Sequence, residues 1–170
     1  MSTTATSTRV TASRPEQSRA RYPDAEGYVE RDGVKTFYES YGEGDPAILL
    51  LPTWSIIHSR CWKAQIPYLA RHFHVLAFDG RGNGKSDRPS EPDAYAAQEF
   101  ADDAIAVMDA TGTERAVIVS LSRGAERSLL LGAQHPERVA AAHKEGGQQV
   151  SDAERAAIDE IAAALGSPAS

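Results

Sequence analysis

The segment SLSRG at residues 120–124 carries the clearest chemical signal, because it sets Ser122 between a strand pattern and a helix pattern. The apolar run AVIV at 116–119 predicts a buried strand, and residues 125–135 predict the helix that leaves it, stopped by Pro136. A hydroxyl on such a bend projects beyond the end of the strand, where it can attack a carbonyl carbon. We therefore interpret Ser122 as the candidate nucleophile.

The neighbours of Ser122 fit this interpretation. Ser120 and Gly124 are small, so they allow the tight turn that the bend requires. The backbone amide of Arg123, at the start of the helix, is the candidate donor to an oxyanion that forms during the attack. In the alternative interpretation, the Ser122 hydroxyl only caps the helix, which is a common role for serine at this place.

The segments before the bend alternate between strand and helix patterns, and these elements must position it. Strand-like runs around the Asp-Gly pair at 32–33 predict a β-hairpin, the runs AILLL at 47–51 and HVLAF at 74–78 predict buried strands, and helical spacing predicts helices over 61–72 and 94–111. The alternation predicts an α/β fold with a mostly parallel sheet, an amino-terminal β-hairpin and flanking helices.

Composition and patterning divide the chain into three parts. Residues 1–25 are rich in Ser, Thr, Ala and Arg and predict a disordered tail, whereas 26–145 hold the core. Residues 146–170 predict an amphipathic helix over 151–165 and a tail. Since no apolar run stands between 140 and 150, we expect the sheet to end at 116–119, with backbone groups exposed at its edge.

Four sequence segments occur in an order that is typical of a known family. They are LLLPTW at 49–54, FDGRGNGKSDRP at 78–89, the bend at 120–124, and HPERV at 135–139. This order is similar to that of the esterase-like α/β-hydrolases, in which the bend is the nucleophile elbow. The resemblance covers residues 27–139, about the first half of such an enzyme, and it implies a truncated α/β-hydrolase fold.

The resemblance also implies roles for residues in the loop after the first buried strand. It implies that the Trp54 amide is the second oxyanion donor, beside Arg123. Pro52 and Thr53 stand where the family usually has His-Gly. The implied substrate is a small carboxylic ester or acyl compound, and no cofactor is implied.

The partners that would activate the serine are not visible in the sequence. In this fold the triad acid and then the histidine follow the nucleophile, on loops after later strands. We interpret His135 and His143, which do follow Ser122, as surface histidines. His58, His72 and His74 precede it, and His58 is nearest to the expected oxyanion loop.

The composition excludes several other classes of function. A formal net charge of -6 disfavours nucleic acid and anionic membranes as partners, and the apolar runs are too short to span a bilayer. No carboxylate and histidine pair has the spacing of metal ligands, so no metal site is expected. The single cysteine, Cys61, excludes an internal disulfide and fits a cytoplasmic protein.

Two functions remain open at this point. In the first, the chain is a serine hydrolase of small acyl substrates, and it is weak or inactive in isolation because its triad is incomplete. Alternatively, it is a non-catalytic fragment or interaction module that pairs with another chain, such as a second copy, through the exposed sheet edge.

Overall fold

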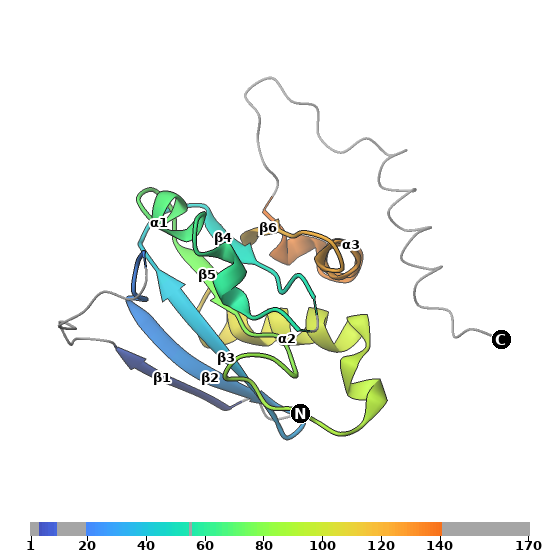
Figure 1. The fold of residues 1–170 in the computed structure, drawn as a ribbon. Coiled ribbons are helices and arrows are strands. Elements are labelled where there is room, and N and C mark those ends of the chain that lie inside the picture. The colour runs from blue at the N-terminus through green and yellow to red at the C-terminus, as the bar shows by residue number, and fades with distance from the viewer. Residues whose placement is uncertain (1–3, 10–19, 55, 141–170) are drawn as a thin grey trace.

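A computed structural model of the chain describes residues 4–9, 20–54 and 56–140. They form one mixed sheet with helices on both faces (Figure 1). The strand order is β1-β2-β3-β5-β4-β6. The strands are β1 (Thr4–Arg9), β2 (Ala25–Arg31), β3 (Val34–Tyr41), β4 (Ala47–Leu50), β5 (Val75–Phe78) and β6 (Ala116–Val119). The helices are α1 (Ile66–Leu69), α2 (Ala97–Ala110) and α3 (Gly124–Gln134), with short 3-10 turns at Ser59–Trp62, Pro92–Tyr95 and Pro136–Arg138.

The predicted α/β architecture is confirmed. Strands β5, β4 and β6 pair in parallel, and β2 and β3 form the predicted antiparallel hairpin. The hairpin turns at Asp32 and Gly33, whose φ angles of 52° and 78° match the left-handed turn that an Asp-Gly pair favours. The β3 strand then pairs antiparallel with β5, so the hairpin extends the parallel part into a mixed sheet.

Alternate residues of the central strands supply two separate cores. Leu49 and Leu76 point to the face covered by α2 and α3, where Val107 and Leu131 pack. On the opposite face, the neighbouring strand residues pack against α1 and the 3-10 turn before it, with Trp62 and Ile66 in contact. Because both faces of β4 and β5 are covered, these strands consist of unbroken apolar runs.

The amino-terminal segment differs from the prediction of a disordered tail over 1–25. Thr4–Arg9 forms β1, which pairs antiparallel with β2 along the whole strand. Composition misses such a strand, because pairing at an open sheet edge depends on backbone hydrogen bonds and needs no apolar side-chain pattern. The predicted helix over 151–165 lies outside the described residues.

The helix predicted over 61–72 is shorter than expected. It is divided into the 3-10 turn Ser59–Trp62 and the single turn α1, with Pro67 near the start of α1. Proline lacks an amide proton and clashes with the preceding turn, so a continuous helix through residue 67 is disfavoured. No helix in the described part of the chain is long and apolar enough to cross a membrane.

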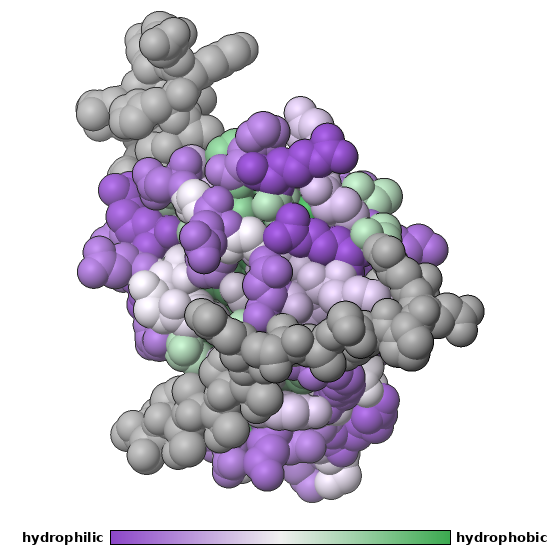
Figure 2. All heavy atoms as spheres, turned by 90° about the vertical axis from the view of Figure 1, so that its left-hand side faces the viewer, coloured by the Kyte–Doolittle hydropathy of each residue, from purple (hydrophilic) through white to green (hydrophobic). Residues whose placement is uncertain are grey.

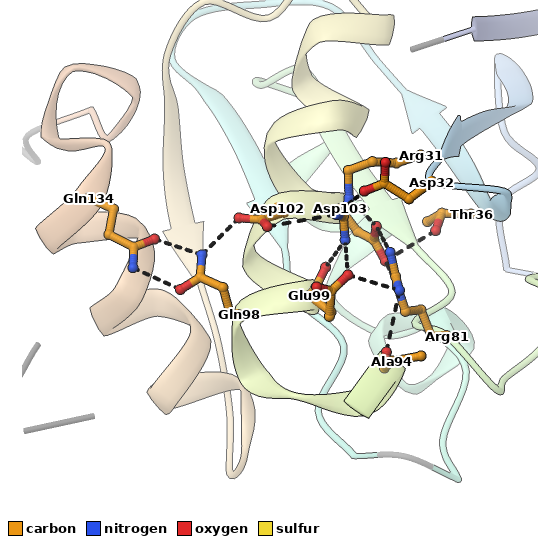
Figure 3. Close-up of polar contacts among 10 residues, drawn as sticks. All are labelled: Arg31, Asp32, Thr36, Arg81, Ala94, Gln98, Glu99, Asp102, Asp103 and Gln134. Atoms are coloured by element: carbon orange, nitrogen blue, oxygen red, sulfur yellow. Dashed lines mark hydrogen bonds and ion pairs between the residues drawn. The ribbon is translucent and has the colours of Figure 1, made fainter. Parts of the chain in front are cut away.

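A buried ionic network fixes the loop after β5 against α2 (Figure 3). Asp103 on α2, 1% exposed, accepts two hydrogen bonds from Arg81 at 2.7 and 2.9 Å and one from Arg31 at 3.1 Å. Glu99, one turn earlier on α2, pairs with the same two arginines. The network thus joins β2, the loop at 79–89 and α2 through one carboxylate-bearing helix face.

Candidate active site

The Ser122 bend has the geometry expected for a projecting nucleophile. Ser122 has φ 57°, a left-handed conformation that residues other than glycine rarely adopt. The turn is closed by hydrogen bonds from the Gly124 amide to the Leu121 carbonyl and from the Ala125 amide to the Ser122 carbonyl, each 3.0 Å. Ser122 itself is exposed. The backbone strain therefore holds an accessible hydroxyl at the carboxyl end of the parallel strands.

The two small residues of the bend meet close neighbours. A Cβ atom on Gly124 would lie 3.1 Å from the Pro52 carbonyl oxygen and 3.2 Å from the Ser120 Cβ, so a larger residue would force the loop and the bend apart. The Ser120 hydroxyl lies 3.1 Å from the Ser128 hydroxyl on α3. Ser120 thus fits within the tight bend and hydrogen-bonds to the helix.

The loop at 51–54 lies against this bend. The Leu51 amide donates to the Val119 carbonyl at 2.9 Å, which carries the β4–β6 pairing to the start of the loop. The Trp54 carbonyl accepts from the Ile57 amide at 3.3 Å and from the Asn83 side chain at 3.4 Å. The structure therefore brings the loop of Trp54 and the bend of Ser122 together, although the sequence separates them by more than sixty residues.

Arg127 is a residue of this site that the sequence analysis did not find. It lies on α3, 4% exposed, and donates to the Pro52 carbonyl at 2.7 Å, while its guanidinium stacks 3.6 Å from the centre of the Phe100 ring. Burial, with added repulsion from Arg123, lowers its pKa to about 10. Its position three residues before Leu130 on the apolar side of α3 is the sequence signal that a buried arginine leaves.

The histidines of the described residues have other partners. The His58 Nδ1 accepts from the Arg60 amide at 3.1 Å, the His74 Nε2 lies 2.9 Å from the Ser40 hydroxyl, and His135 lies 3.7 Å from Glu137. Burial lowers the pKa of His74. Within 20–54 and 56–140, no imidazole forms a hydrogen bond with Ser122; His143 lies outside this part.

Among the same described residues, no group of three or more histidine, cysteine, aspartate and glutamate side chains could hold a metal ion.

Comparison with known proteins identifies the family to which this fold belongs. The sequence model of the alpha/beta hydrolase fold matches residues 46–161. The chain belongs to the alpha/beta hydrolase fold family. Among curated relatives of this alpha/beta hydrolase, it is 36% identical to epoxide hydrolase A of Mycobacterium tuberculosis, over 68% of this chain and 36% of that protein. It is 32% identical to the bifunctional esterase/perhydrolase DCH of Acinetobacter calcoaceticus, over 65% of this chain and 40% of that protein.

Solved structures support the same assignment. Est816, described as an N-acyl homoserine lactone degrading enzyme, is 42% identical with a TM-score of 0.60, over 66% of this chain and 42% of that structure. The enol-lactonase of Burkholderia xenovorans LB400 is 30% identical with a TM-score of 0.61, over 66% and 43%. This alpha/beta hydrolase chain thus spans less than half the length of the relatives that it matches.

Proposed function

We propose that the chain is a serine hydrolase of small carboxylic esters or related acyl compounds, with Ser122 as its nucleophile. The observation that carries the proposal is the left-handed φ of 57° at Ser122, an exposed serine between β6 and α3. Such a strained bend persists only where the surrounding structure enforces it, and here the β4 pairing, Gly124 and the Arg127 bond to the loop do so.

The relatives favour an acyl substrate. The esterase/perhydrolase, the N-acyl homoserine lactone degrading enzyme and the enol-lactonase are all named for ester or lactone chemistry, in which a carbonyl carbon is bonded to oxygen. The epoxide hydrolase is named for a three-membered ether, which has no carbonyl. Serine at the bend favours the first group, because attack by a hydroxyl on a carbonyl produces the oxyanion that helix amides stabilise.

In the proposed reaction, the Ser122 oxygen bonds to the acyl carbon and the carbonyl electrons move to its oxygen. The amides of Trp54 and Arg123 would hold that oxyanion before it collapses, releases the alcohol and leaves an acyl-serine for water to hydrolyse. No histidine of the described residues is hydrogen-bonded to Ser122 as a base, so the hydroxyl proton passes to solvent water, and the departing alkoxide takes a proton from solvent to become the alcohol. Without that base, catalysis rests on binding and the oxyanion donors, roughly 10³–10⁴-fold over water, so we expect slow turnover by the isolated chain.

A fluorophosphonate probe tests the nucleophile directly. The full chain should be labelled at Ser122, slowly, and Ser122→Ala should abolish the labelling. The matched control is Ser90→Ala, which removes an exposed hydroxyl outside the bend and should be labelled like the unmodified chain. Label on another residue, or equal labelling of Ser122→Ala, would contradict the assignment.

We propose a second function because of the edge strand. Strand β6 pairs with β4 along one edge. Along its other edge, within the described residues, it forms only the β-bridge between Ala116 and Val139. Val117, Ile118 and Val119 are only half-buried. An apolar parallel strand in this position is suited to pair with another chain. In that case the chain is an interaction module, and the fluorophosphonate probe should not react.

A further inference from the structure

A cavity lies beside α1, on the opposite side of the sheet from α2 and α3. It measures about 660 Å³, within the usual range for small-molecule sites. The segment at Arg21, the end of β3 and the stretch from Ile57 to Pro67 enclose it. Figure 2 shows the left-hand side of the view in Figure 1, where near the upper end apolar surface lies between strongly hydrophilic side chains. The proposed serine chemistry uses none of this lining.

The charged side chains that line the cavity in the described part of the chain are cationic. Arg21, Arg60 and Lys63 contribute guanidinium and ammonium groups, and His58 adds an imidazole; among the described residues of the lining there is no carboxylate. In a chain with a net charge of -6, this concentration of positive charge runs against the overall balance. Three cations around one concave space attract an anion by focusing the local field.

The positive charges of Arg21, Arg60 and Lys63 differ in how far other groups of the protein already balance them. Arg21 donates to Asp24 at 2.9 Å and to the Ala70 carbonyl at 3.2 Å, so it is held at the rim with part of its charge balanced. Within the part of the chain that the structure describes, the side chains of Arg60 and Lys63 form no ion pair. These two cations therefore remain available to a ligand.

A smaller neighbouring cavity shares His58 and Arg60 and contains two buried carboxylates, Glu39 and Asp79. The Tyr41 hydroxyl donates to Glu39 at 2.6 Å, and the amides of Ser59 and Lys85 donate to Asp79 at 2.8 and 2.9 Å. Hydrogen bonds from the protein thus stabilise both carboxylates. The two carboxylates lower the positive field at Arg60, whereas Lys63 does not line this smaller cavity.

Part of the lining is apolar. Ile57, Ile66 and Pro67 contribute side chains to the cavity, and Ile57 is 37% exposed. Apolar walls beneath a cationic rim are complementary to a molecule with a charged end and a hydrocarbon body. We propose that this cavity binds an amphiphilic anion, with its carboxylate or phosphate head at Arg60 and Lys63 and its apolar body against the isoleucines.

Cys61 provides a reporter inside the cavity. It is the single cysteine of the chain, it is exposed, and it lines the cavity. Partial desolvation raises the pKa of its thiol, so alkylation of the free protein should already be slower than that of a thiol with an ordinary pKa. A bound ligand should slow it further by covering the sulfur.

The experiment measures the rate at which N-ethylmaleimide, an uncharged reagent, alkylates Cys61 in the full chain. Decanoate and decyl phosphate, below their micellar concentrations, are the probes for the two head groups, and decanol is the neutral comparison. We expect at least one anion to slow the reaction severalfold and decanol to have much less effect. The anion that protects at the lower concentration identifies the preferred head group.

Charge variants test the assigned residues. The double variant Arg60→Ala/Lys63→Ala should weaken the protection about tenfold, since each surface charge pair contributes up to about 1 kcal/mol. The control Lys35→Ala/Arg115→Ala removes the same charge from exposed positions outside the cavity and should keep full protection. Equal protection by decanol, undiminished protection in the first double variant, or no protection by either anion would overturn the proposal.

Discussion

Ser122 occupies a backbone conformation that is unfavourable for a serine. A left-handed φ brings the Cβ atom close to the following carbonyl and costs roughly 1–2 kcal/mol for residues other than glycine. The bend therefore stores conformational energy at the residue that we assign as nucleophile. Strain of this kind at a site without a structural need for it points to a functional reason.

Glycine at this position should release the strain. We expect Ser122→Gly to be more stable than Ser122→Ala by about 1 kcal/mol, because only glycine adopts positive φ without steric cost. Urea unfolding of both variants measures the difference, and both should lose the fluorophosphonate label. Equal stability of the two variants would show that the bend relaxes to an ordinary conformation in solution.

The interior of α2 contains the polar contacts that hold the loop after β5. The Asp103 carboxylate, 1% exposed, forms ion pairs with Arg31 and Arg81. One turn earlier, Gln98 exchanges hydrogen bonds with Gln134 at 2.7 Å, which joins α2 to α3 (Figure 3). The helix that closes one core thus also fixes the loop and the helix of the bend.

Removing the charge of Asp103 should make the protein less stable to unfolding. We expect Asp103→Asn to lower the free energy of unfolding by about 3 kcal/mol, because two arginines would lose a buried partner. The control is Asp109→Asn on the same helix, whose carboxylate pairs with Arg138 at 2.7 Å but is 56% exposed. That change should cost less than about 1 kcal/mol. Denaturant unfolding compares the two, and similar losses would contradict a dominant role for the buried network.

The sheet as a whole ends in an apolar parallel strand in the described part of the chain. The Val119 carbonyl accepts from Leu51, and the Ala116 carbonyl accepts from Ala140 on the opposite side. Because alternate residues direct their backbone groups to opposite sides of a strand, Ile118 points its amide and carbonyl to the open edge. If two copies pair, this backbone is the place where they meet.

A proline at position 118 distinguishes association through the backbone of the edge strand from non-specific association through exposed apolar side chains. Ile118→Pro removes the outward amide but leaves the hydrogen bonds of Val119 to the loop after β4, so it should lower the weight-average mass at high protein concentration. Sedimentation measures the mass. The control Leu121→Ser removes a 63% exposed apolar side chain and should leave association unchanged. A chain that is monomeric at all concentrations would rule out self-pairing, and a fall in mass for Leu121→Ser alone would assign association to side chains.

Local sequence determined the elements that carry the site. The unbroken apolar runs of β4, β5 and β6, the Asp32-Gly33 turn and the small residues around Ser122 each encode their structure within a few positions, because propensity and periodicity act locally. These local patterns were therefore sufficient to predict the α/β fold and the family from the sequence. The roles of Ser122, Trp54 and Arg123 remain our proposal.

Tertiary structure alone decided the long-range contacts. No pattern in the sequence joins Arg127 to the Pro52 carbonyl, Arg31 to Asp103, or Arg21 to the cavity beside α1. The pairing of β1 with β2 was also missed, since it depends on an open backbone edge and not on side-chain composition. Burial, charge pairing and edge pairing are properties of residues that meet only after the chain has folded, which is why local patterns cannot specify them.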